Sequence, residues 1–241
     1  MEATTRMTNK GPFFAALLAV GWFALHIYGV FFLDVAASPL LTLSLVIGLT
    51  WIYTGLFIVA HDAIHETLFG RGNAWNDRIG TVIHFLYAGF SFKAMKAAHI
   101  DHHLYPGTER DPDFNADDPE RFAPWFFKFF TRYFGVRQLA VLTLLAIIQF
   151  ALGANLFNLV LMWGVPAILS SVQLFYFGTY LTHRHDDAFT DDHNARSNTY
   201  PEWLSLLTCF HFGYHHEHHL YPAEPWWRLP TKRREALEAM P

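Results

Sequence analysis

Histidine is the residue type whose spacing is most unusual in this chain. The stretch from His211 to Pro222 begins with five histidines in nine residues, and the segment from His99 to Pro106 repeats its second part. Both copies read His-x-x-His-His-Leu-Tyr-Pro. On a helix, residues at positions i, i+3 and i+4 project from one face. Each copy is therefore expected to direct three imidazoles toward a single point, as a metal site requires.

The repeat selects among the histidines. It pairs His215, His218 and His219 with the three histidines of the first copy and leaves His216 outside the pattern. Another pair, His61 and His65, has the i, i+4 spacing of neighbours on a helix. The three motifs supply eight imidazoles, too many for one ion with four to six ligands and suited to two ions. An all-imidazole pair of ions with open positions suits iron used in oxygen chemistry.

Composition narrows the class of protein. The chain of 241 residues is long enough for one domain with a sizeable core. Hydrophobic residues make up 52% and charged residues 16%, whereas soluble domains carry roughly 25% charged residues, so a membrane protein is expected. The net charge of −4 gives no reason to expect nucleic-acid binding. The single cysteine, Cys209, excludes an intrachain disulfide, a Cys-ligated iron–sulfur cluster and a Cys-rich zinc site.

The elements that position the histidines are expected to be membrane helices. Apolar runs predict spans at about 12–33, 40–60, 139–157 and 159–181, with a kink at Pro166 in the last. They form a single membrane domain, 12–230, between a polar N-terminal tail, 1–11, and a basic C-terminal tail, 231–241. The first run is too long for a signal peptide and no cleavage site follows it, so we expect it to stay in the protein. Segment 79–92 is too short for a full span and is expected to be interfacial or re-entrant. The aromatic-rich segment 105–138 is expected to lie at the membrane interface.

The charged loops predict the orientation. Every Lys and Arg lies in the two termini or the central loop, and none lies in 34–39 or 153–158. The positive-inside rule therefore puts both termini and the central loop in the cytoplasm, together with all three histidine motifs. The predicted fold is an all-α integral protein of the cytoplasmic (inner) membrane. It has about four transmembrane helices and a cytoplasmic cap of interfacial helices that carries a histidine-rich di-iron site.

Further residues complete the expected site. His183 is preferred over His185 as a ninth ligand because it lies nearer the membrane end of the fourth span. Carboxylates near the motifs could orient the imidazoles, or be ordinary solvated or helix-capping groups; they are Asp62, Asp101, Asp111, Asp113 and Glu217. His26 and His84, each alone in an apolar run, are interpreted as hydrogen-bonded packing residues.

The three motifs together resemble those of the membrane di-iron superfamily of fatty-acid desaturases and hydroxylases. The chain is most similar to the bacterial β-carotene ketolases of the 4,4'-oxygenase type within it, and the likeness runs from about Leu25 to Pro230. The stretches that carry it are Phe57-Ile-Val-Ala-His61-Asp-Ala, Leu86-Tyr-Ala-Gly-Phe90, Pro106-Gly-Thr-x-x-Asp111-Pro-Asp-Phe114, Phe177-Gly-Thr, His183-Arg-His185, His193-Asn-Ala-Arg-Ser197, Ser205-Leu-Leu-Thr-Cys-Phe-His-Phe-Gly213 and Pro225-Trp-Trp-Arg-Leu229.

The resemblance implies a reaction and a ligand set. A non-haem di-iron oxygenase of this kind would use O2 to oxidise the C4 methylene of a β-ionone ring to a ketone, through two hydroxylations and loss of water. β-Carotene would become echinenone and canthaxanthin, and zeaxanthin would become astaxanthin. The superfamily pattern, with His183 added, places catalytic metal ligands on His61, His65, His99, His102, His103, His183, His215, His218 and His219. His185, His193, His211 and His216 would lie near the metals or the substrate, and Glu66 departs from the glycine usual in ketolases.

The resemblance also implies an electron donor and a membrane-dissolved substrate. The chain has no Gly-x-Gly-x-x-Gly fingerprint and no cysteine set for an iron–sulfur centre, so electrons must come from a partner such as ferredoxin and its reductase. Lys93, Lys96 and the run 232–234 would either dock an acidic donor or anchor the protein at the membrane. Aromatic residues near the motifs would line a carotenoid tunnel or serve as interface anchors; they are Tyr87, Phe90, Phe92, Phe175, Tyr176, Phe210, Phe212 and Tyr214.

Other functions fit the histidines less well. A carotenoid ring hydroxylase or a fatty-acid desaturase or hydroxylase would keep the same di-iron site and change the product. A metal transporter would carry ionisable ligands along a path through the bilayer, whereas these gather at one face. A bis-histidine haem protein would need paired histidines inside a helix bundle, and neither His26 nor His84 has an evident partner.

Overall fold

A computed structural model describes residues 10–239 of the chain as helices joined by loops, with no β-sheet in that range. Three helices are long and apolar enough to cross a membrane: α1 (Lys10–Phe31), α2 (Pro39–Ile64) and the continuous helix from Leu156 to His183. A fourth span arises if α5 (Phe122–Tyr133) and α6 (Val136–Ala151), which are bent by 73°, count as one broken span. The all-α membrane fold with about four spans is thereby confirmed.

Helix α2 is the centre of the bundle. It contacts α1, α3 (Trp75–Ala88) and α8 (Val165–Phe175), and its last third is buried. Gly55 of α2 allows the close approach of Phe210, whose nearest ring atom would lie 2.5 Å from a Cβ at this position. The segment that leads into the third histidine motif is therefore seated directly on α2.

The third apolar segment differs from the expected span 139–157. Helix α6 ends at Ala151, and Gly153 adopts a left-handed φ of 97°. Asn155 then caps a new helix, accepting hydrogen bonds from the backbone N–H groups of Phe157 and Asn158. Glycine in a left-handed turn followed by an asparagine cap ends one helix and starts the next. The last span therefore begins at Leu156.

The long last helix contains two π-helical turns. Its segments are α7 (Leu156–Leu159), η1 (Val160–Gly164), α8, η2 (Tyr176–Tyr180) and α9 (Leu181–His183). A kink was expected at Pro166. At this point the helix contains the π turn η1, which ends just before α8 and its Pro166. Proline lacks an N–H and its ring collides with the carbonyl of the preceding turn, so a locally wider turn lets the helix continue.

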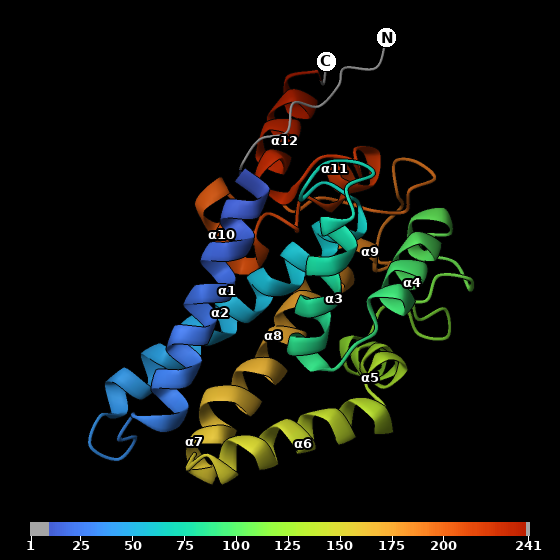
Figure 1. The fold of residues 1–241 in the computed structure, drawn as a ribbon. Helices are drawn as coiled ribbons and strands as arrows, with labels where there is room; N and C mark the ends of the chain where they lie inside the picture. The colour runs from blue at the N-terminus through green and yellow to red at the C-terminus, as the bar shows by residue number, and fades with distance from the viewer. Residues whose placement is uncertain (1–9, 240–241) are drawn as a thin grey trace.

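The remaining helices cover one end of the bundle. They are α4 (Phe92–Leu104), α10 (Glu202–Cys209), α11 (His215–Leu220), η3 (Trp226–Arg228) and α12 (Leu229–Glu238). Figure 1 shows α10, α11 and α12 at the end where α1 begins, opposite α6 and α7. The C-terminal segment expected as a tail thus folds as a helix within the described residues. This end of the molecule collects all three histidine motifs.

Candidate metal centre

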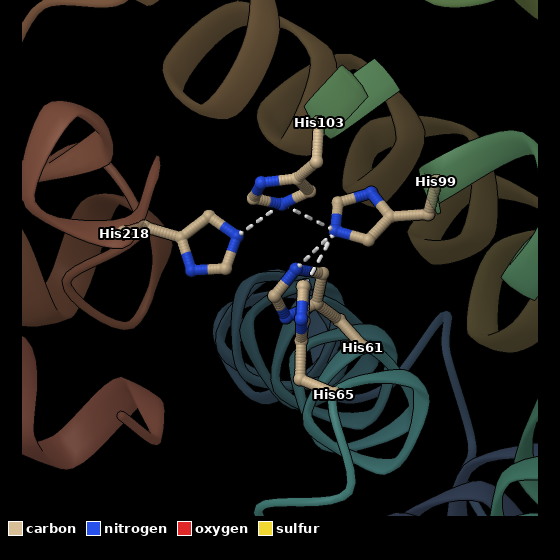
Figure 2. Close-up of side chains that lie close together, drawn as sticks. All are labelled: His61, His65, His99, His103 and His218. Atoms are coloured by element: carbon tan, nitrogen blue, oxygen red, sulfur yellow. Dashed lines mark hydrogen bonds between the residues drawn. The ribbon is translucent and has the colours of Figure 1, made fainter. Parts of the chain in front are cut away.

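Five histidines from three helices converge at the end of α2 (Figure 2). His61 comes from α2 and His65 from the C-cap that follows it, His99 and His103 come from α4, and His218 comes from α11. The Nε2 atom of His99 lies 2.9 Å, 2.8 Å and 3.1 Å from the Nε2 atoms of His61, His65 and His103. The Nε2 atoms of His103 and His218 are 3.0 Å apart. We call these five residues the first group.

Hydrogen bonding does not account for this geometry. A neutral imidazole nitrogen either carries one hydrogen or offers one in-plane lone pair. The Nε2 atom of His99 cannot form good hydrogen bonds with three other ring nitrogens at once. Metal–imidazole bonds of about 2.1 Å at right angles place ligand nitrogens about 3.0 Å apart. The separations in the first group fit nitrogens that share a central cation.

Four further histidines form a second group. His102 comes from α4, His183 from α9, and His215 and His219 from α11, and all four are buried. The Nε2 atom of His219 lies 3.2 Å from those of His102 and His215. The Nε2 atom of His183 is buried and has no hydrogen-bond partner among the described residues. A cation is the partner that would satisfy it.

Each His-x-x-His-His motif divides between the two groups, which corrects the expectation that it serves one point. The first and last histidines of a motif share a group, as His99 and His103 do, while the middle one, His102, joins the other. At about 100° per residue, positions i and i+4 differ by about 40° around a helix, but i+3 and i+4 differ by about 100°. His215 and His219 belong likewise to the second group, and His218 to the first.

A carboxylate and a carbonyl orient two of the second-group rings. The Nδ1 atom of His102 lies 3.0 Å from both carboxylate oxygens of Asp111. The Nδ1–H of His183 donates to the carbonyl of Asn194 at 2.7 Å. Such bonds fix the tautomer and leave Nε2 free to bind a metal. Burial acts to lower the pKa of His102, but the Asp111 carboxylate outweighs it and leaves that pKa raised.

Burial keeps most of the other imidazoles neutral. It lowers the pKa values of His99, His215, His218 and His219 well below their usual range, and neighbouring imidazoles lower them further. At His65 the same burial lowers the pKa to about 4. Neutral rings have a lone pair available, which metal binding requires. The donor set therefore fits a metal centre of two ions.

The remaining candidate carboxylates have other partners. Asp62 is buried, with one carboxylate oxygen accepting from the backbone of Trp226 and the other 3.6 Å from Nδ1 of His61. Asp101 is exposed on α4. Glu217 is buried within α11 and binds Arg233 of α12. Of the carboxylates considered, Asp111 is the one that forms a hydrogen bond to a grouped histidine.

The histidines outside the pattern also have distinct surroundings. His185 packs on Phe114 rather than in either group. The Nε2–H of His216 donates to the carboxylate of Asp191 at 2.7 Å, which ties α11 to the loop between α9 and α10. The ring of His193 lies 6.1 Å from that of His219, and His211 stacks on Trp226.

Glu66 closes the turn after the first motif. Its backbone has a left-handed φ of 59°, a conformation that favours glycine. Its carboxylate accepts from the backbone N–H of Gly72 at 2.8 Å and pairs with Lys96 of α4 at 3.4 Å. The side chain thus joins the turn to the helix that carries the second motif, away from the cavity.

An apolar cavity of about 490 Å³ adjoins the histidines. His61, His99, His102 and His215 form one end of its wall, and its other end reaches the exposed side chains of Leu156, Val160 and Ile168. Of the aromatic residues expected to line a tunnel, Tyr87, Phe90 and Phe212 do so, while Phe92, Phe175, Tyr176, Phe210 and Tyr214 are not part of the wall.

Sequence reasoning missed other residues of this wall. They include Trp163 and Gly164 of the last span, Phe129 and Tyr133 of α5, and Leu142 and Ala146 of α6. Helices α5 and α6 are joined by a sharp bend. The spacing of apolar residues along the sequence therefore does not reveal that side chains of both helices line the same cavity.

Comparison with known proteins gives consistent results. The profile of the family described as "Fatty acid desaturase" matches residues 36–146 and 136–241. A "Beta-carotene ketolase" of Paracoccus sp. (strain N81106 / MBIC 01143) is 47% identical over 97% of this chain and 93% of its own length. A "Zeaxanthin 4-ketolase" of Chlamydomonas reinhardtii is 34% identical over 90% of this chain and 52% of its own length. A human "Sphingolipid delta(4)-desaturase/C4-monooxygenase DES2" is 28% identical over 76% of this chain and 62% of its own length. No solved structure matches the chain.

Proposed function

This chain belongs to the fatty acid desaturase family, and on that basis we propose that it is a β-carotene ketolase, an oxidoreductase that converts the C4 methylene of β-ionone rings to a ketone. The observation that carries the proposal is the 47% identity to a β-carotene ketolase over nearly the whole chain. The two histidine groups beside an apolar cavity supply a site suited to that reaction.

The nine grouped histidines are the proposed metal ligands. The first group would hold one iron ion and the second group the other. When bound, the two ions supply activation of O2 for oxidation of an unactivated C–H bond. Asp111 and the carbonyl of Asn194 orient His102 and His183 so that their Nε2 atoms face the centre. What supports this assignment is the convergence of nitrogens that hydrogen bonding cannot explain.

The cavity would bind the ring and the adjoining polyene. Its wall is built mainly from aliphatic and aromatic side chains. The residues at its outer end are exposed and belong to the apolar outer surface of the helices. A carotenoid dissolved in the bilayer could enter there without crossing water. The apolar wall would also exclude bulk water from the reacting end. Two hydroxylations at C4 and loss of water from the resulting diol give the ketone.

The proposed setting is the cytoplasmic side of the inner membrane. The distribution of Lys and Arg supports this orientation. Electrons would come from an external donor such as ferredoxin with its reductase. His65, His99 and His103 of the first group are half-buried, whereas the second group is fully buried. The first group is therefore the proposed point of electron entry.

Pigment analysis tests the function. The chain is expressed in bacteria that accumulate β-carotene, beside His218→Ala and the matched control His216→Gln, which changes a histidine of the same helix outside both groups. We expect red-shifted pigment with one oxygen gained and two hydrogens lost per ring. His218→Ala should abolish it and lower the iron content, whereas His216→Gln should retain both.

Other products would select other functions. A gain of oxygen without loss of hydrogen would indicate a carotenoid ring hydroxylase. Unchanged β-carotene in cells that contain folded, iron-loaded protein would contradict the ketolase and point to a fatty-acid desaturase or hydroxylase.

A further inference from the structure

Among the described residues that line the cavity, Asp113 is the one carboxylate. It lies beside the second group, since its ligand atom is within 4.8 Å of those of His102 and Asp111. Apart from the histidines, the wall around it is mainly aliphatic and aromatic. An ionisable group in such a wall is unfavourable unless a polar partner accompanies it.

Asp113 is held in place from three directions. Its backbone N–H donates to Asp111 at 2.8 Å, and its carbonyl accepts from the indole N–H of Trp125 at 2.7 Å. The hydroxyl of Tyr133 donates to its Oδ1 atom. The hydrogen bonds within residues 10–239 use Oδ1 of this carboxylate and not the other oxygen, Oδ2. Asp113 is thus held in the cavity wall, and its Oδ2 atom takes part in none of these hydrogen bonds.

The unmodified substrate cannot use this acceptor. β-Carotene is a hydrocarbon and has no polar atom to donate. The first oxidation changes this, because it places a hydroxyl group on C4, the carbon that must react again. The reacting carbon has to lie at the histidine end of the cavity, which is where Asp113 lies.

We propose that Asp113 accepts a hydrogen bond from the C4 hydroxyl of the half-oxidised ring, and that this bond makes the enzyme yield the ketone rather than the alcohol. The proposal deepens the proposed function and rests on it. The bond would retain the alcohol in the cavity and turn its remaining C4–H toward the metal centre. Tyr133, which also lines the cavity, would position Asp113 through the hydrogen bond from its hydroxyl to Oδ1.

The chemistry of the two rounds is balanced without a covalent step at Asp113. In each round O2, two electrons from the donor and two protons convert one C4–H bond to C4–OH, and the second oxygen atom leaves as water. The diol then loses one water molecule and forms the carbonyl. Asp113 contributes a hydrogen-bond acceptor, and leaving the hydroxyl of the alcohol buried without one should weaken its retention by a factor of about 10 to 100.

The experiment measures product ratio and binding separately. Asp113→Leu removes the acceptor at similar size, Asp113→Asn keeps a carbonyl oxygen, and Asp117→Leu is the control on an exposed residue of the same loop. β-Carotene is supplied to membranes containing each variant, and the ratio of 4-hydroxy to 4-keto end groups is determined. Binding of 4-hydroxylated carotenoid and of β-carotene to the metal-free proteins is compared by co-purification.

We expect Asp113→Leu to consume β-carotene but to raise the alcohol-to-ketone ratio about 10-fold or more. Its metal-free form should lose its preference for the hydroxylated carotenoid, and Asp113→Asn should recover part of both. An unchanged ratio in folded Asp113→Leu would overturn the proposal, as would equal loss of binding for both carotenoids. Loss of all oxidation together with loss of iron would also overturn it, assigning Asp113 to the metal centre. If the wild-type chain leaves β-carotene unoxidised, the proposed function fails instead, while the binding comparison still tests Asp113.

Discussion

Arg233 of α12 and Glu217 of α11 form an ion pair inside the third histidine motif. The guanidinium Nη1 lies 2.9 Å from Oε1 of Glu217, whose side chain is fully buried. The other carboxylate oxygen accepts from the hydroxyl of Ser197. The C-terminal helix is therefore joined by a charge-assisted bond to the short helix that carries His215, His218 and His219.

Arg233→Ala should destabilise the protein and loosen the centre. It leaves the buried Glu217 without its cation, at a cost of roughly 3 kcal/mol. Chemical unfolding in detergent would measure the loss, and metal content would report the position of α11. Arg234→Ala is the control, because its pair with Glu202 is about half exposed and should contribute less than about 1 kcal/mol. Equal losses in both variants would contradict the role of the buried pair, and Glu217→Gln should partly rescue Arg233→Ala.

Asp111→Asn should weaken metal binding. The change removes the carboxylate that fixes the tautomer of His102, and such losses lower metal affinity roughly 10- to 100-fold. Iron retention after graded exposure to a chelator would measure it. Asp101→Asn alters an exposed carboxylate on the same helix as His102 and should behave as wild type. The prediction would be refuted if Asp111→Asn and the wild-type protein lost their iron at the same chelator concentration.

His183→Gln should remove the second metal ion and leave the first. His183 belongs to the second group only, so the first group keeps all five of its histidines. Iron per chain is expected to fall by half, with ketone formation lost. His185→Gln should retain iron, because this ring packs on Phe114 outside both groups. The reverse result would make His185 the ninth ligand.

The metal-free protein should become less stable as pH falls. Burial lowers the pKa values of His65 and His211 to about 4 in the folded state, below their ordinary value of 6.5. Between pH 4 and pH 6.5 the unfolded chain binds more protons than the folded chain. The free energy of unfolding therefore rises with pH across this window, and this part of the stability is lost as pH falls toward 4. Unfolding of chelator-treated protein at about pH 5 and about pH 7 would test the sign. His65→Gln should make the stability depend less on pH. Greater stability at the lower pH would contradict the lowering of the two pKa values by burial.

Gly164→Val should restrict access to the cavity. Gly164 lines the wall, and a Cβ there meets no atom within 4 Å, so the added side chain would occupy open space. A change of this size in an apolar pocket lowers kcat/KM roughly 10-fold or more. Gly48→Val is the matched control, in a helix with equally open surroundings but outside the wall. Similar kinetics in both variants, with iron retained, would place substrate entry elsewhere.

Much of the centre could be predicted because its signals are local. The repeated His-x-x-His-His motifs and the i, i+4 pair identified histidines that the structure brings together. Their division into two groups could not be predicted, because it depends on how α2, α4 and α11 are rotated relative to one another. A motif read on one helix gives directions around that helix and not the partners that its side chains meet.

The loops were harder to predict, because their contacts also depend on how distant segments come together in the fold. Five carboxylates lie near the motifs in sequence. Of these, only Asp111 forms a hydrogen bond to His102, and only Asp113 lines the cavity. Hydropathy likewise predicted a span over 139–157, whereas Gly153 and Asn155 divide it. Glu66 was noticed as a departure, and its role in tying a left-handed turn to Lys96 required the fold.

The division of the motifs has a consequence for biosynthesis. Each group needs a histidine from α11: His218 completes the first, and His215 and His219 complete the second. Chains emerge from the ribosome N-terminus first, at about 5–20 residues per second. While α11 is still inside the ribosome, His61, His65, His99 and His103 already lie outside it as an incomplete set. If these groups hold the metals as proposed, both positions would be completed only after α11 has been made, when every membrane helix of the chain has already been synthesised.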